Sequence, residues 1–243
     1  MRKPDVKVVI LGDMNVGKTS LLHRYTERRF KDTISTVGGA FFLKQWGPYN
    51  ISIWDTAGRE QFHGLGSMYC RGASAVILTY DVTNWQSLSE LEQRFLSLTD
   101  TAHPDCIYAI VGNKADLTDA CAHLVEMDDG HMSEDIQDTP HHPASTTSTS
   151  SVLLHKQVDR MDALALYWRI LRYKGLEENA SPAAERMCFE TSAKTGYNVD
   201  FLFETLFEMV LPSILKKRNE GDASTVDLEH STETKRTKAG CCR

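Results

Sequence analysis

Long apolar runs are missing from this sequence of 243 residues. A helix that crosses a membrane needs about 18 or more apolar residues in succession, and no stretch here approaches that length. The first four residues lead directly into the short apolar segment 6–11 and a glycine-containing loop. A signal peptide would need a longer apolar stretch and a cleavage site. The sequence therefore predicts neither a membrane span nor a secretory signal.

Cysteines at the spacing of metal ligands and an excess of positive charge are also missing. Four of the six cysteines are scattered without the spacing of metal ligands, which predicts core or loop thiols in a reducing compartment; these four are Cys70, Cys106, Cys121 and Cys188. The net charge of −6 gives no indication of nucleic-acid binding, so no nucleic-acid partner is expected. Much of this charge lies in residues 118–151, which carry seven acidic side chains and no Lys or Arg.

What the chain does contain is a regular alternation of short apolar runs and helical patterns. Strands are expected at residues 6–11, 51–55, 75–81, 106–112 and 187–191, and helices at 18–29, 87–101, 159–173 and 199–215. The strands are apolar over most of their length, as in a parallel sheet buried on both faces. Residues 41–53, interrupted by 47–50, indicate a hairpin that adds one antiparallel edge strand. The pattern predicts an α/β fold with helices on both faces and a ligand site at the carboxyl ends of the strands.

Two segments interrupt the alternation. Residues 126–151 are acidic and then rich in Ser, Thr and Pro, which predicts a disordered insert at about 120–155 within a domain that covers residues 1–218. A polar tail is expected at 219–243. The insert is either a tolerated surface loop or an acidic docking or phosphorylation segment. Its histidines are too loosely spaced to indicate a metal site.

The most informative motif is residues 12–19, GDMNVGKT, which match G-x-x-x-x-G-K-[ST] between a predicted strand and a predicted helix. Glycines let the backbone curl so that its N–H groups face phosphates, and the helix N-terminus adds positive potential. Lys18 would reach the β- and γ-phosphates, and the hydroxyl of Thr19 would coordinate Mg²⁺. The residues expected to bind phosphate are Gly12, Asn15, Val16, Gly17, Lys18, Thr19 and Ser20.

A second motif, NKAD at residues 113–116, indicates which base is bound. A carboxylate in the plane of guanine can accept from both N1–H and the 2-amino group, whereas adenine offers no such pair of donors. Asp116 is therefore the expected specificity residue, with Lys114 covering the base and Asn113 tying loops together. The downstream residues Ser192, Ala193 and Lys194 complete the predicted base site. A P-loop kinase or ATPase, the alternative class, would have the phosphate motif but would lack both NKAD and the Ser-Ala-Lys segment at 192–194.

The sequence DTAG at residues 55–58 follows another predicted strand. Asp55 would hold Mg²⁺ through water, and the N–H of Gly58 would meet the γ-phosphate. Thr36, in the loop after the first predicted helix, would ligate Mg²⁺ when the γ-phosphate is present. Loops that touch only the γ-phosphate are released on hydrolysis, which makes a switch.

Together these segments resemble the Rab family of Ras-like GTPases over about residues 5–118 and 155–215. Beyond the motifs above, the resemblance rests on TVGGAF (36–41), WDTAGRE (54–60), MYCRGA (68–73), LTYDVT (78–83), ETSAK (190–194) and the terminal Cys-Cys-Arg. It implies GTP or GDP with Mg²⁺ as cofactors and a role in vesicle traffic. It also implies exchange factors, GTPase activators, GTP-dependent effectors, and escort and GDP-dissociation-inhibitor proteins as partners. The expected location is the cytosolic face of endosomal, phagosomal or Golgi membranes, with a cytosolic pool.

The resemblance also implies roles for single residues. Phe30 matches the aromatic residue that packs edge-on against guanine. Phe41, Trp54 and Tyr69 match the apolar triad that effectors bind, although the segment 36–55 is a few residues shorter than is usual in the family.

One position departs from the family in a way that affects catalysis. Arg59 stands where the family has the Gln that orients the attacking water, and an arginine has no acceptor atom for that water. The bulky Met14 would crowd the same region. The expected catalytic residues are Lys18, Thr36, Gly58 and Arg59. Because Arg59 replaces the usual Gln, we expect GTP hydrolysis to be slow. The alternative is a GTP-binding module that hydrolyses essentially none.

The last residues predict membrane attachment. Cys241 and Cys242 do not fit the C-a-a-X pattern, but paired terminal cysteines are typical of geranylgeranylated Rab proteins. Two lipid chains give stable anchoring where one is marginal.

Overall fold

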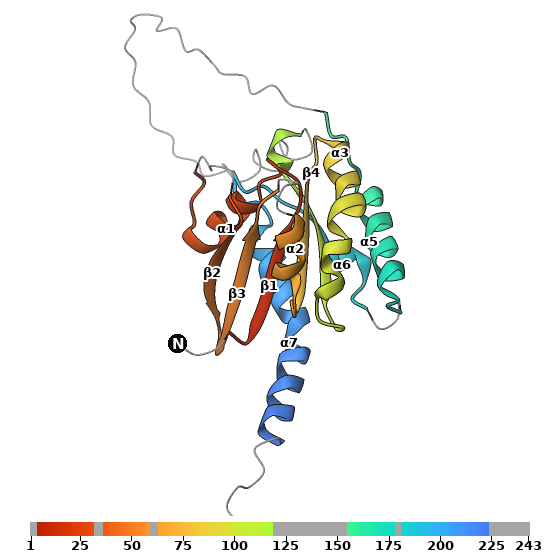
Figure 1. Ribbon diagram of the computed structural model, residues 1–243. Coiled ribbons are helices and arrows are strands. Elements are labelled where there is room, and N and C mark those ends of the chain that lie inside the picture. The colour runs from red at the N-terminus through yellow and green to blue at the C-terminus, as the bar shows by residue number, and fades with distance from the viewer. Residues whose placement is uncertain (1–3, 32–35, 59–62, 119–154, 178–180, 224–243) are drawn as a thin grey trace, which may run out of the picture.

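The computed structural model describes residues 4–31, 36–58, 63–118, 155–177 and 181–223 (Figure 1). Arg59, most of the expected insert and the two terminal cysteines lie outside the described residues. Within these ranges, no helix combines the length and the apolar character that crossing a membrane requires.

A single six-stranded sheet organises the chain, in the order β2-β3-β1-β4-β5-β6. Only β2 runs antiparallel to its neighbour, which confirms the expected mostly parallel sheet with one antiparallel edge. The central strands are buried on both faces, as their apolar sequences predict. The strands are β1 (Val6–Leu11), β2 (Gly39–Trp46), β3 (Tyr49–Thr56), β4 (Ala75–Asp81), β5 (Ile107–Asn113) and β6 (Cys188–Glu190).

Helices cover both faces of the sheet (Figure 1). They are α1 (Lys18–Glu27), α2 (His63–Cys70), α3 (Trp85–Glu90), α5 (Arg160–Lys174), α6 (Ala184–Met187) and α7 (Val199–Ala223). α1 packs against α7 on one face, while α2, α3 and α5 lie on the other. Local chemistry sets their ends: Asp159 and Asp162 form a capping box at the start of α5, and Gly175 ends that helix in the left-handed conformation.

Several helices differ from the expectation. The helix predicted at 87–101 is interrupted, because α3 gives way to a π-helical turn at Leu91–Phe95 and a 3₁₀ turn at Ser97–Thr101. α7 continues to Ala223, past the predicted end at residue 215 and into the segment expected to begin the tail. The residues that follow 215 are mostly polar, so they carry no apolar periodicity that would indicate a helix. α2 and α6 were not predicted.

The parallel strands bring distant loops to one edge of the sheet. β1, β3, β4, β5 and β6 all run in the same direction, so the loops that follow them emerge together. These loops contain the phosphate motif, the DTAG motif, the NKAD motif and residues 191–194. The motifs therefore meet at the carboxyl ends of the parallel strands, where the ligand site is expected.

Away from these loops, an aromatic cluster joins α1, α7 and the tip of the β2–β3 hairpin. The ring of Tyr25 in α1 stacks on Phe203 in α7 with their centroids 4.1 Å apart. The Tyr25 hydroxyl donates to Oε1 of Glu204 at 3.1 Å, and Nε1 of Trp46 at the hairpin tip donates to Oε2 of the same carboxylate at 2.6 Å. Burial and the neighbouring carboxylate raise the pKa of Tyr25, so its hydroxyl stays protonated and able to donate.

Replacing Phe203 by alanine should destabilise the protein strongly, because its ring is fully buried between α1 and α7. We expect Phe203→Ala to lower the free energy of unfolding by about 3–5 kcal/mol, measured by urea denaturation at fixed nucleotide and Mg²⁺ concentrations. Phe201→Ala on the same helix is the matched control, since that ring is 62% exposed and should cost much less. Equal losses in the two variants would contradict the packing described here.

Candidate functional site

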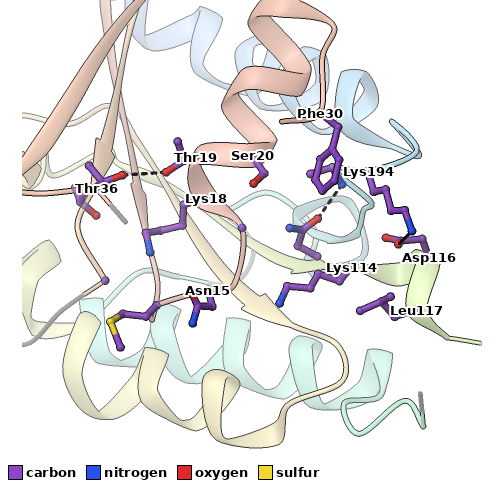
Figure 2. A pocket seen from close by; sticks show the side chains of 16 residues that line it. Asn15, Lys18, Thr19, Ser20, Phe30, Thr36, Lys114, Asp116, Leu117 and Lys194 are labelled. Carbon is purple, nitrogen blue, oxygen red and sulfur yellow. Dashed lines mark hydrogen bonds and ion pairs between the residues drawn. The ribbon is translucent and has the colours of Figure 1, made fainter. Parts of the chain in front are cut away.

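A pocket of about 280 Å³ opens at the loop-bearing edge of the sheet. It gathers thirteen of the predicted nucleotide-binding residues from segments far apart in sequence: Asn15, Gly17, Lys18, Thr19, Ser20, Phe30, Thr36, Gly58, Asn113, Lys114, Asp116, Ala193 and Lys194. Figure 2 shows Thr19, Thr36 and Lys18 at one end, and Asp116, Leu117 and Lys194 at the other. The pocket therefore has two chemically different ends.

Four other predicted residues do not line the pocket but have identifiable places. The carbonyl of Gly12 accepts a hydrogen bond from Lys18, and the carbonyl of Val16 accepts one from Asn113. Asp55 is fully buried beside Thr19. Ser192 contacts Asp116. These four residues therefore support the lining rather than form it.

Lys18 dominates the charge of the first end. Its ammonium donates to the carbonyls of Gly12 and Asp13, at 2.8 Å and 2.7 Å. An ammonium has three donors, so one more can serve an anion. Burial lowers the pKa of Lys18 to about 8, and the carboxylates of Asp55 and Asp13 oppose that shift. A phosphate group at this position would add the negative charge that favours the protonated form.

The loop that holds Lys18 requires glycine at residue 17. Gly17 has a φ of +95°, and a Cβ built there would lie 2.3 Å from Nδ2 of Asn113. That amide reaches across from the end of β5 to donate to the carbonyl of Val16 at 2.9 Å. Its Oδ1 accepts from the backbone N–H of Ala193 at 3.1 Å. Asn113 thereby connects the phosphate motif to the loop after β6, as its predicted role requires.

Three oxygen-bearing side chains converge beside Lys18. Oδ2 of Asp55 accepts from the hydroxyls of Thr19, at 2.6 Å, and Thr36, at 2.9 Å, and the two hydroxyls lie 3.0 Å apart. The other carboxylate oxygen, Oδ1, is buried without a hydrogen-bond partner. Burial raises the pKa of Asp55, while the two hydroxyl donors act in the opposite direction. Hydroxyl and carboxylate oxygens are hard donors of the kind that Mg²⁺ prefers, so these residues fit that ion.

The segment that leaves β3 lies directly against the phosphate motif. A Cβ built on Gly58 would lie 2.5 Å from the backbone nitrogen of Met14 and 2.6 Å from the carbonyl carbon of Asp13. Only a glycine permits this approach. Met14 lines the same part of the pocket with its side chain 43% exposed.

The second end of the pocket has a carboxylate held in place by its neighbours. Oδ1 of Asp116 accepts from the hydroxyl of Ser192 at 2.5 Å, and Nζ of Lys194 lies 4.0 Å from Oδ2. Lys114 adopts a left-handed backbone conformation and pairs with Asp81 at 2.7 Å. Figure 2 shows the ring of Phe30 on the same side of the pocket as Lys194. This arrangement offers an acceptor, a cation and an aromatic ring to a planar ligand.

Two further lining residues were not predicted, Thr56 and Leu117. The hydroxyl of Thr56 donates to the carbonyl of Ile10 at 2.7 Å, so it connects two strands. Leu117 directly follows Asp116 and lies at the same end of the pocket (Figure 2). Its position next to the base motif was the signal that could have identified it.

The predicted effector triad forms a cluster outside the pocket. The ring centroids of Phe41 and Trp54 lie 5.1 Å apart, and those of Trp54 and Tyr69 lie 5.6 Å apart. These rings come from β2, β3 and α2, and Phe41 is 47% exposed. The ammonium of Lys7 lies 5.2 Å from the centre of the Trp54 ring. The structure thus brings the three aromatic residues into one partly exposed group.

Comparisons with known proteins agree with this geometry. A family profile described as the Ras family matches residues 7–212. The chain is 64% identical over 242 residues to the human Ras-related protein Rab-20 and 62% identical over 245 residues to the mouse protein of that name, in both cases over the full length of both chains. It is 32% identical over 250 residues to the Ras-related protein Rab-24 of Dictyostelium discoideum, covering 99% of this chain and 98% of the relative. The chain therefore belongs to the Rab group of the Ras family, small GTPases that bind guanine nucleotide and act in membrane traffic.

Proposed function

We propose that this protein binds GTP and GDP with Mg²⁺ in the pocket described above and acts as a membrane-anchored switch in vesicle traffic. The observation that carries the proposal is the placement of Lys18 and the Thr19–Thr36–Asp55 oxygens at one end of a single pocket and of Asp116 at the other. The proposed pathways are endosomal, phagosomal or Golgi traffic. The proposed partners are exchange factors, GTPase activators and GTP-dependent effectors. Escort and GDP-dissociation-inhibitor proteins are proposed to carry the lipidated chain.

In this proposal each end of the pocket has its own task. Mg²⁺, when bound by Thr19, Thr36 and Asp55, would neutralise phosphate charge and orient the γ-phosphate. Lys18 stabilises negative charge on the β- and γ-phosphates through its remaining donor. The backbone of Gly58 lies against Asp13 and Met14 of the phosphate motif, which is where its N–H is proposed to meet the γ-phosphate. Thr36 and Gly58 sense the γ-phosphate, so both segments change when it is lost.

Asp116→Asn should weaken GTP and GDP binding by about 100-fold or more. The substitution replaces a charged acceptor by a neutral amide, and hydrogen bonds to charged groups are worth about 1.5–3 kcal/mol each. Titration with fluorescent nucleotides, followed by competition with ATP, measures the change. Asp105→Asn, an exposed carboxylate, is the matched control and should leave affinity unchanged. Tight binding of ATP by the unmodified protein would contradict the proposed base specificity.

We also propose that GTP hydrolysis is slow. Arg59 follows Gly58 directly in the sequence and has no acceptor with which to orient an attacking water. Met14 lines the pocket and lies beside Gly58, which supports the same proposal because a bulky side chain there leaves less space for a water. The second candidate function is that of a GTP-binding module that hydrolyses essentially no GTP, and it rests on the same arginine.

Arg59→Gln should accelerate single-turnover hydrolysis by about tenfold or more, since tenfold corresponds to about 1.4 kcal/mol of transition-state stabilisation, the scale of one hydrogen bond. Rapid-quench measurement of phosphate release from preloaded GTP gives the rate. Arg71→Gln, at an exposed arginine, is the matched control. If the unmodified protein hydrolyses as fast as the glutamine variant, the slow-hydrolysis proposal is wrong. If only the variant hydrolyses measurably, the second candidate gains support.

Membrane anchoring is proposed through geranylgeranyl groups on Cys241 and Cys242. Figure 1 shows α7 running away from the sheet on the side opposite to the loops that form the pocket. This helix has 25 residues, which corresponds to a length of about 37 Å. Its direction supports an arrangement in which the nucleotide site faces away from the bilayer.

Replacing both terminal cysteines by serine should move the protein from the membrane fraction to the soluble fraction of cells. A single replacement should leave weaker, reversible attachment, because one lipid chain anchors marginally. Fractionation and mass spectrometry of the intact chain measure the distribution and the attached lipid. Cys121→Ser is the matched control and should stay membrane-bound; membrane attachment of the double variant at the normal level would contradict the proposal.

A further inference from the structure

Arg94 lies where helix α3 changes into a π-helical turn, beside the phosphate motif. The turn spans Leu91–Phe95, and π-helical turns inside helices occur frequently at functional sites. Leu91 and Phe95 remain in the core, while Nη1 of Arg94 lies 2.8 Å from Oε2 of Glu90 and 3.7 Å from Oδ1 of Asp13. Arg94 thus joins α3 to the loop that contains Lys18.

Asp13, the residue that Arg94 contacts, has two other attachments. Its carbonyl accepts from the ammonium of Lys18 at 2.7 Å. Its backbone faces Gly58, where an added Cβ would lie 2.6 Å from the Asp13 carbonyl carbon. A displacement of Asp13 would therefore move a partner of Lys18 and the surface against which Gly58 lies.

The charge of Asp13 makes its pairing with Arg94 important. The carboxylate is 28% exposed, and Arg94 and Glu90 are 20% and 15% exposed, so solvent screens this group only partly. Asp13 lies inside the loop that we propose to hold a polyphosphate, and like charges repel. GTP carries more negative charge than GDP, so an unpaired carboxylate would oppose GTP more strongly.

From these contacts we infer that Arg94 is a positioning residue that favours GTP over GDP. It neutralises Asp13 and holds the segment 13–14 against Gly58 and Lys18. The inference rests on the proposed binding of nucleotide phosphates by residues 12–19. A purely structural arginine, which only joins two elements, would affect both nucleotides equally.

The test compares dissociation rates of fluorescent GDP and of a non-hydrolysable fluorescent GTP analogue from the full-length protein at fixed Mg²⁺. Arg94→Met keeps an unbranched apolar stem and removes the guanidinium, whose Cζ lies 5.5 Å from the centre of the Phe95 ring. We expect it to increase dissociation of the GTP analogue about three- to tenfold more than that of GDP, as removal of one partly screened charge interaction implies. Arg94→Lys should recover part of the difference.

Two further variants separate charge from packing. Asp13→Asn added to Arg94→Met should restore the ratio of the two dissociation rates, because the phosphate motif then no longer carries the Asp13 carboxylate. Arg169→Met, which removes an ion pair with Glu92 on the same side of the molecule, is the matched control and should not alter the ratio. Thermal denaturation of each variant shows whether it is folded.

The outcomes distinguish the inference from the function on which it rests. An unchanged ratio in Arg94→Met, or no restoration by Asp13→Asn, would overturn the role of Arg94 while leaving nucleotide binding intact. Failure of the unmodified protein to bind either nucleotide would overturn the proposed function and this inference with it. A selective loss for the GTP analogue, restored by the second substitution, supports both.

Discussion

The side-chain amide of Asn113 connects the two ends of the pocket, and much of the site depends on it. Its amino group donates to the carbonyl of Val16, and its oxygen accepts from the backbone of Ala193. The residue is 2% exposed, so loss of either bond would leave buried polar groups unsatisfied. The same amide leaves no room for a Cβ at Gly17. One side chain therefore sets the distance between the phosphate motif and the loop after β6.

Around this connection, the pocket contains charges whose burial is unfavourable without a partner. The ammonium of Lys18 has a lowered pKa and the carboxylate of Asp55 has a raised one, both because of burial. A ligand that carries phosphate together with a divalent cation would add a further opposite charge beside each of these two groups. The buried oxygen of Asp55 that has no hydrogen-bond partner points to the same chemistry. These features support the proposed binding of a polyphosphate with Mg²⁺ rather than of a neutral ligand.

Much of the fold could be predicted because the central strands leave little freedom. β1 and β4 have the bounds that their apolar runs indicate, since each lies between two other strands and is buried at nearly every position. The phosphate and base motifs could be placed because the carboxyl ends of parallel strands meet at one edge. The contact between Arg94 and Asp13 could not be predicted, because it joins residues 81 positions apart through a π-helical turn that no periodicity indicates. The effector cluster likewise depends on α2, whose glycine-containing sequence shows no helical pattern.

The hairpin formed by β2 and β3 connects Thr36 and Gly58, the two residues proposed to sense the γ-phosphate. Thr36 precedes β2 and Gly58 follows β3, and the backbone N–H of Ala57 donates to the carbonyl of Gly38 at 2.9 Å. This hydrogen bond joins the segments that contain Thr36 and Gly58 across the open end of the hairpin. The closed end of the hairpin is held differently, because Trp46 donates to Glu204 in α7. Since α7 also packs on α1, the closed end is attached to the buried α1–α7 contact. We expect the open end, with Phe41 and Trp54 close to it, to respond to the nucleotide while the closed end stays in place.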